Sequence, residues 1–126
     1  MSARFVIFCT ALSGFITVAL GAFASHMLRA RLSERLYEVL QTGIQYQMFH
    51  TLALFGVGLL MLRQSDRGLR QTAVLFMAGM VFFSGSLYVL ALTGQHWLGA
   101  VTPVGGVLFL AGWLNLGRVS FRQLSE

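Results

Sequence analysis

Several polar side chains that could relay protons or bind a polar ligand recur at helical spacing inside long apolar runs. At about 100° per residue, Tyr46, Gln47 and His50 share one side of a helix, and Ser84 and Tyr88, four residues apart, share one face of another. Polar groups are costly in hydrocarbon and are often functional there. These five residues form the candidate intramembrane polar cluster, although bonding to one another as contacts between helices is the simpler interpretation.

Most cofactor-based or catalytic alternatives lack the residues they require. His26 and His50 differ in depth by about nine residues, or roughly 13 Å, and fit poorly as ligands of one haem iron. His96 could join His26 at a zinc ion, but no carboxylate or thiolate accompanies them. Triad hydrolysis and proton-coupled export call for an acid inside a span, whereas the acids lie in connections or the tail: Glu34, Glu38, Asp66 and Glu126. We expect no enzyme, no cofactor and no metal site.

The composition is that of an integral membrane protein. Of the 126 residues, 56% are hydrophobic and 10% are charged, whereas about a quarter are charged in soluble domains. The length indicates a single domain, residues 1–126. The net charge of +5 comes from arginines at the edges of apolar runs, which is typical of membrane anchors and not of a nucleic-acid interface. The lone Cys9 excludes an intramolecular disulfide.

The spacing of the charges predicts four membrane-spanning helices. Two uncharged runs of 24 residues, between Arg4 and Arg29 and between Glu38 and Arg63, each make about 36 Å of helix, enough to cross a hydrocarbon core of about 30 Å. A 47-residue run in the second half is too long for one crossing and contains the turn-prone residues 93–96. The predicted fold is an all-α four-helix bundle with spans near residues 5–25, 41–62, 71–92 and 97–117.

The distribution of arginines predicts the orientation. With four crossings, the two termini and the 63–70 connection lie on one side and carry six arginines. The 29–38 and 93–96 connections lie on the other side and carry three. Because loops rich in positive charge stay in the cytoplasm, we expect both termini to be cytoplasmic.

The N-terminal run also has the parts of a secretory signal peptide. Arg4 precedes an apolar stretch that ends near the small-residue pattern Ala22-Phe23-Ala24. The stretch covers about 20 residues, however, whereas a signal core has roughly 7 to 15. We therefore interpret this segment as an uncleaved first helix.

Residues 29–38 have the pattern of a short amphipathic helix between the first two spans. Leu28, Leu32, Leu36 and Leu40 recur every four residues, and arginines and glutamates occupy the other face. We predict that this helix lies in the membrane interface. Binding of a partner helix would use the same features and stays open as an alternative.

Small residues in the first span predict close helix packing. Ala11, Gly14, Val18, Gly21 and Ser25 follow spacings of three and four residues, and so form a seam that stays on one face and lets another backbone approach closely. The seam could pack against another helix of the same chain or against a second copy. The sequence leaves both possibilities open.

Pro103 predicts an irregularity in the fourth span. It is followed by Gly105 and Gly106, so this helix is either kinked or begins near Thr102 with Pro103 in its first turn. Broken helices form ligand sites in transporters. A purely structural role is the simpler interpretation.

Four strings stand out in order along the chain: Gly21-Ala22-Phe23-Ala24-Ser25-His26, Gln45-Tyr46-Gln47-Met48-Phe49-His50, Phe83-Ser84-Gly85-Ser86-Leu87-Tyr88, and Thr102-Pro103-Val104-Gly105-Gly106 with Gly112-Trp113. Together they resemble the YgdD-like family of small four-span membrane proteins of unknown function, over nearly the whole chain. The resemblance implies a bacterial inner-membrane location. It brings no catalytic or binding residues with it.

We expect a non-enzymatic membrane protein that acts through contacts with membrane lipids, a membrane protein partner or a second copy of the chain. The alternative is a small-molecule or ion carrier that uses the cluster around His50. A carrier requires this cluster to line a hydrated cavity, whereas an interaction protein requires it to be dry and bonded to itself. In either case His50 lies near the membrane midplane and should point inward, with Tyr46, Ser84 or Tyr88 as its partner.

Overall fold

The computed structural model describes residues 1–122 and 124, and nearly all of these residues are helical. Four helical segments are long and apolar enough to cross a membrane, and each contains one of the four predicted spans. The predictions of an all-α protein and of four membrane-spanning helices are therefore confirmed. The predicted tail residue Glu126 lies outside the described residues. The segments are Ala3–Leu28, Glu34–Arg63, Arg67–Thr93 and His96–Arg122.

Three of the four segments contain a turn that is not α-helical. The first consists of α1 (Ala3–Ala19), the π-helical turn η1 (Leu20–Ala24) and α2 (Ser25–Leu28). The second is α3 alone (Glu34–Arg63). The third consists of α4 (Arg67–Met80), the π-helical turn η2 (Val81–Gly85) and α5 (Ser86–Thr93). The fourth begins with the 3₁₀ turn η3 (His96–Ala100) and continues as α6 (Thr102–Arg122).

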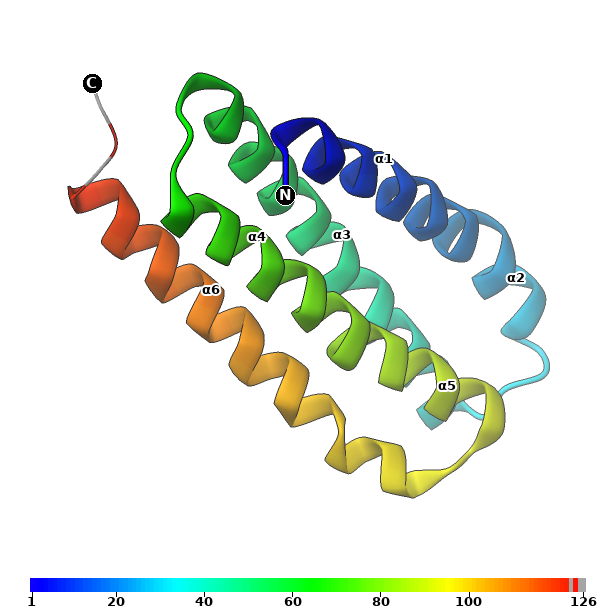
Figure 1. Ribbon diagram of the computed structural model, residues 1–126. Coiled ribbons are helices and arrows are strands. Elements are labelled where there is room, and N and C mark those ends of the chain that lie inside the picture. Colours follow the sequence, from blue (N-terminus) through cyan, green and yellow to red (C-terminus); the bar gives the residue numbers. More distant parts are fainter. Residues whose placement is uncertain (123, 125–126) are drawn as a thin grey trace.

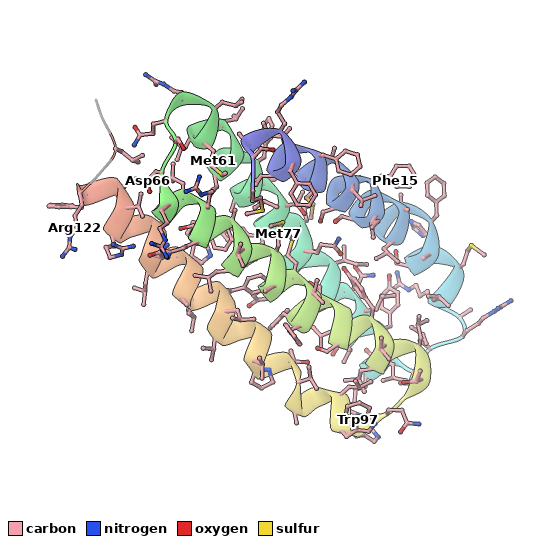
Figure 2. All side chains as sticks on the ribbon, in the orientation of Figure 1. Phe15, Met61, Asp66, Met77, Trp97 and Arg122 are labelled. Carbon is pink, nitrogen blue, oxygen red and sulfur yellow. The ribbon has the colours of Figure 1, made fainter. Side chains whose placement is uncertain are left out.

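Segments that follow one another in the sequence are also neighbours in space. The extensive helix pairs are α1 with α3, α3 with α4 and α5, and α4 with α6, an order that Figure 1 also shows. The N-terminus, the connection after α3 and the last turn of α6 lie at one end of the bundle, which we term the arginine-rich end. Figure 2 shows Asp66 and Arg122 at this end and Trp97 at the opposite end.

The main core joins all four segments. Its buried members come from α1, α3, α4 and α6, while large apolar side chains also cover the outside of the helices. Phe15, for example, is 74% exposed and points away from α1 (Figure 2). An apolar exterior of this kind is expected where lipid is the solvent. The core residues are Val6, Leu54, Val57, Leu69, Ala73, Phe76, Phe109 and Val119.

The predicted interfacial helix over residues 29–38 is wrong. Residues 29–33 form a turn, and α3 begins directly at Glu34. The Ser33 hydroxyl caps this helix by accepting a hydrogen bond from the N–H of Leu36 at 3.2 Å. Because neither proline nor a second cap interrupts the chain until Arg63, the charged first turns continue into the second span as one helix.

The predicted break in the 47-residue run is present at Gly94. This glycine has a φ of 72°, and its N–H donates to the Leu90 carbonyl at 2.7 Å, which ends α5. After η3, α6 begins at Thr102 with Pro103 in its first turn. Proline suits that position because the first turn of a helix has no partner for a backbone N–H. Pro103 therefore marks the start of a helix and not a kink within one.

Each π-helical turn is accompanied by a serine that bonds back to the backbone. The Ser25 hydroxyl donates to the Gly21 carbonyl at 2.7 Å, and the Ser86 hydroxyl donates to the Phe83 carbonyl at 2.9 Å. A π turn disturbs the regular ladder of backbone bonds, and within a membrane the affected groups need another partner. The Ser25 hydroxyl supplies a partner to the Gly21 carbonyl, and the Phe83 carbonyl accepts from both the hydroxyl and the backbone N–H of Ser86.

Gly105 is a point of very close approach between α6 and η2. A Cβ atom at this position would lie 2.3 Å from the backbone nitrogen of Phe83, so only glycine fits. At the neighbouring Gly106, a Cβ atom would be 4.0 Å from the ring of Phe83, which is an ordinary contact. The two adjacent glycines therefore have different surroundings.

Gly14 and Gly21 of the small-residue seam face α3 of the same chain, whereas Val18 of the predicted seam is 63% exposed. A Cβ atom at Gly14 would lie 3.8 Å from Thr51, and one at Gly21 would lie 3.7 Å from Ile44. Both distances are ordinary contacts, so neither position is as tight as Gly105.

Candidate functional site

Gln47 is the centre of a hydrogen-bonded network that joins α1, α3 and α5. Its side-chain N–H donates to Ser13 Oγ at 3.0 Å, and the Tyr88 hydroxyl donates to Gln47 Oε1 at 2.5 Å. Thr51 Oγ1 donates to the Gln47 carbonyl at 2.6 Å and lies 2.6 Å from Ser13 Oγ, which is the donor in that bond. Gln47 is 7% exposed. The buried amide thus has partners at both its donor and its acceptor.

Ser84 links η2 to α3 in a separate contact. Its hydroxyl donates to the Gly43 carbonyl at 2.7 Å, and the side chain is 1% exposed. Gly43 also makes room for Tyr88, because a Cβ atom there would lie 2.7 Å from Tyr88 Cε1. The missing side chain at Gly43 therefore allows the Tyr88 ring to reach Gln47.

His50 is directed toward α6. Its Nδ1 lies 2.9 Å from the Tyr46 carbonyl oxygen, and its Nε2 lies 3.0 Å from Trp113 Nε1. A carbonyl only accepts and an indole N–H only donates, so Nδ1 carries the proton and Nε2 does not. In this arrangement the imidazole is neutral and both of its nitrogens are occupied.

Aromatic rings enclose His50. Its ring stacks on that of Phe109, with centroids 3.5 Å apart and planes within 6° of each other. Phe49 and Phe76 present T-shaped contacts at centroid distances of 5.2 and 5.4 Å. The His50 side chain is 3% exposed as a result. These surroundings hold a neutral imidazole without a charged neighbour.

The five predicted site residues fall into two groups with different partners. Gln47, Ser84 and Tyr88 bind between α1, α3 and the third segment, whereas His50 turns to α6. Tyr46 contributes its backbone carbonyl to His50, and within the described residues its hydroxyl makes no hydrogen bond. His50 points inward and has partners, but these are not Ser84 or Tyr88.

Trp113, Ser13 and Thr51 also belong to the site but were not predicted from the sequence. Trp113 did offer a signal, because an indole N–H inside an apolar span needs an acceptor. Serine and threonine hydroxyls in helices commonly bond to a carbonyl one turn back, as Thr51 does with Gln47. The sequence therefore does not show which serines and threonines also bond to another helix.

A groove runs between α3 and α6 beside His50, and we term it the α3–α6 groove. It has a volume of about 970 Å³, opens to the outside and is mostly apolar. A smaller hollow of about 440 Å³ lies between the same helices toward the arginine-rich end, and Trp113 lines both. The α3–α6 groove is lined by Gln45, Tyr46, Met48, Phe49, His50, Leu52, Phe83, Pro103, Gly106, Val107, Phe109, Leu110 and Trp113.

The described residues contain no group of three or more histidine, cysteine, aspartate or glutamate side chains placed to hold a metal ion. At the opposite end of the bundle, His96 Nδ1 lies 3.4 Å from a guanidinium nitrogen of Arg35. His50 is occupied by Trp113 and Tyr46.

Comparison with known proteins identifies the family. The model of a family described as "Protein of unknown function (DUF423)" matches residues 20–106. The chain belongs to the DUF423 family. It is 47% identical over 113 residues to the "UPF0382 inner membrane protein YgdD" of Escherichia coli strain K12, covering 90% of this chain and 86% of that protein. No solved structure matches the chain significantly.

Two further relatives extend this similarity to other bacteria. A "UPF0382 membrane protein" of Haemophilus influenzae is 44% identical, with 91% of this chain and 92% of that protein covered. The "UPF0382 membrane protein YwdK" of Bacillus subtilis is 43% identical, with 84% and 87% covered. This DUF423 chain is thus an integral membrane protein from a family without an assigned biochemical activity. The matched segment 20–106 includes His50, Gln47 and Tyr88 and ends before Trp113.

Proposed function

We propose that this DUF423 protein is a non-enzymatic membrane protein that binds phospholipid laterally, with an acyl chain in the α3–α6 groove. The observation that carries the proposal is the contrast between its polar and apolar surfaces. The side chains of Gln47, Tyr88 and His50 have hydrogen-bond partners within the protein, while the groove beside His50 is mostly apolar and open to the outside. Ligand pockets usually have volumes of about 300–1,000 Å³, and the groove lies within this range at about 970 Å³.

The state of His50 favours lipid binding over the carrier alternative. A carrier would need polar groups that are free to meet a substrate in a hydrated cavity. Both nitrogens of His50 have protein partners, and three phenylalanine rings surround it. His50 borders the groove, but the lining around it is mostly apolar and includes Phe49 and Phe109.

The length of the groove favours an acyl chain as its occupant. Along α6 it extends from Pro103 to Trp113, about 15 Å at 1.5 Å per residue. That is about half of a 30 Å hydrocarbon core, or the depth of one leaflet. This length suits an acyl chain, which occupies one leaflet, better than a partner helix, which would cross both.

We further propose a bacterial inner-membrane location with both termini in the cytoplasm. The name of the Escherichia coli relative supports the location. The excess of arginines at the arginine-rich end supports the orientation.

Lipid retention by groove variants tests the proposal. Gly106→Leu should fill the groove, whereas Gly117→Leu adds the same side chain on the same helix, outside the groove lining. A Cβ atom meets little at either position, so both variants should fold. We expect mass spectrometry of protein purified from native membranes to find phospholipid bound to the wild type and to Gly117→Leu, and several-fold less on Gly106→Leu.

Two outcomes would contradict the proposal. Equal retention by both variants would show that the groove is not the binding site. If a soluble metabolite co-purified with the wild type in place of lipid and was lost in His50→Leu, the carrier alternative would be supported.

A further inference from the structure

A third hollow, of about 680 Å³, lies between α4 and α6 at the arginine-rich end. It has no lining residue in common with the α3–α6 groove, because it uses another side of α6. Its lining changes in character along α4, from charged to polar to apolar. The lining residues are Met1, Arg67, Arg70, Gln71, Val74, Leu75, Ala111 and Asn115.

The charged part of this hollow has unused hydrogen-bond donors. Within the described part of the chain, the guanidinium groups of Arg67 and Arg70 make no hydrogen bond or ion pair. The neighbouring Asp66 directs one carboxylate oxygen to the N–H of Leu69 at 3.1 Å, where it caps α4. Guanidinium groups are well suited to bind phosphate, with two parallel hydrogen bonds each.

Asn115 fixes the geometry between the two helices. Its side-chain nitrogen donates to the Gly68 carbonyl and to Thr72 Oγ1, both at 3.0 Å, and joins α6 to α4. Its Oδ1 accepts a hydrogen bond from Arg118 at 2.8 Å, which keeps a third guanidinium near the hollow. The amide of Asn115 is therefore used to build the site, and the free donors are those of the arginines on α4.

The apolar part of the hollow follows one turn further along α4. Val74 is four residues from Arg70, about 6 Å along the helix axis, and Leu75 and Ala111 lie beside it in the lining. Val74 is 51% exposed, so this part is accessible from the membrane. A phospholipid has the same sequence of groups, with a phosphate at the surface and acyl chains below it.

We propose that this hollow binds an anionic phospholipid, with its phosphate on Arg67 and Arg70 and an acyl chain along Val74 and Leu75. An anionic lipid is favoured over a zwitterionic one because the two guanidinium groups have no ion pair within the described residues. Basic pockets at the cytoplasmic ends of membrane helices commonly bind anionic headgroups. The site is distinct from the α3–α6 groove and does not depend on what occupies it.

Native mass spectrometry with added phosphatidylglycerol or phosphatidylcholine tests this site. The double variant Arg67→Gln/Arg70→Gln removes both free guanidinium groups. Arg4→Gln/Arg122→Gln removes the same charge from the same end of the bundle, at exposed residues outside the lining. At about a five-fold loss per arginine, we expect the first variant to bind phosphatidylglycerol about 25-fold more weakly. The control should stay within about two-fold of the wild type, in keeping with the small effect expected of charges outside the site.

Several results would overturn this proposal. Equal losses in the two double variants would indicate a general attraction to positive charge, without a site. Equal affinity of the wild type for the two lipids would remove the preference for an anionic headgroup. If inorganic phosphate displaced bound phosphatidylglycerol as strongly as added phosphatidylglycerol does, the apolar part of the hollow would contribute nothing to binding. The single variant Arg67→Gln, at an exposed residue in the first turn of α4, should show an intermediate loss and checks that folding is not the cause.

Discussion

The bond between His50 and Trp113 joins two residues 63 positions apart and lies where the α3–α6 groove meets the smaller hollow. His50→Leu should lower the free energy of unfolding by about 1–3 kcal/mol, because it leaves the indole N–H of Trp113 without its acceptor. Trp113→Phe removes the donor and keeps a ring in place. Unfolding of the wild type, both single variants and the double variant in detergent would measure the coupling, which we expect to be about 0.6–2 kcal/mol.

The same substitution separates a structural from a transport role in cells. If His50 only stabilises the bundle, any defect of His50→Leu should follow the loss of protein from the membrane. A variant that accumulates normally in the membrane and still causes the cellular defect would contradict the structural role.

In the unfolding experiment, additive changes in the free energy of unfolding for His50→Leu and Trp113→Phe would contradict the bond between the two residues.

Tyr88 and Tyr46 form a matched pair for the Gln47 network. Tyr88→Phe removes the hydroxyl that donates to Gln47 Oε1, and we expect it to lower the free energy of unfolding by about 1 kcal/mol. Tyr46→Phe removes a hydroxyl that makes no hydrogen bond within the described residues, so its effect should be close to zero. Thermal unfolding of the two variants side by side measures the difference, and equal effects would show that Tyr88 is not bonded as described.

At the scale of elements, the contact between α6 and η2 depends on Gly105. Gly105→Ala places a Cβ atom 2.3 Å from the backbone nitrogen of Phe83, which cannot move without shifting a whole helix. We expect a loss of about 1–3 kcal/mol or more in the free energy of unfolding. Gly106→Ala, one residue away with 4.0 Å of clearance, should change it little. Unfolding in detergent compares the two, and equal stability would refute this close approach.

The elements themselves could be predicted because charges and turn residues mark their ends. Arg29, Arg63 and Gly94 each lie at or next to the end of a membrane-spanning segment, where the length and hydropathy of the apolar runs require one. The interfacial helix failed because the leucine spacing over residues 29–38 has the same period in a separate helix as in the first turns of a longer one. Only the Ser33 cap decides where α3 begins.

The candidate site could be predicted only in part, because the residue pattern of one helix shows which residues share a face but not which helices pack against that face. The side shared by Gln47 and His50 was visible in the sequence, but the two residues bond to different helices. Placing Trp113 beside His50 requires knowing how α6 packs on its neighbours, which the close approach of Gly105 to Phe83 and the stacking of Phe109 on His50 help to set. The spacing of residues along one helix does not predict this contact between helices.

At the scale of the whole molecule, orientation follows from the arginines. Six arginines belong to the arginine-rich end and three to the opposite end. When fused after Glu126, a reporter that is active only in the cytoplasm should therefore be active, and one that is active only in the periplasm should be inactive. A reporter fused within residues 93–96 should give the reverse result. A periplasmic C-terminus would contradict the orientation, and termini on opposite sides would contradict four crossings.

The central claim is that an acyl chain occupies the α3–α6 groove down to Trp113, and quenching of that tryptophan tests it most directly. The chain contains two tryptophans, so Trp97→Phe leaves Trp113 as the single tryptophan. In vesicles of phosphatidylcholine with bromine near the acyl chain ends, we predict strong quenching of Trp113, marked loss of quenching in Gly106→Leu, and no change in Gly117→Leu. Equal quenching in all three proteins would contradict the claim.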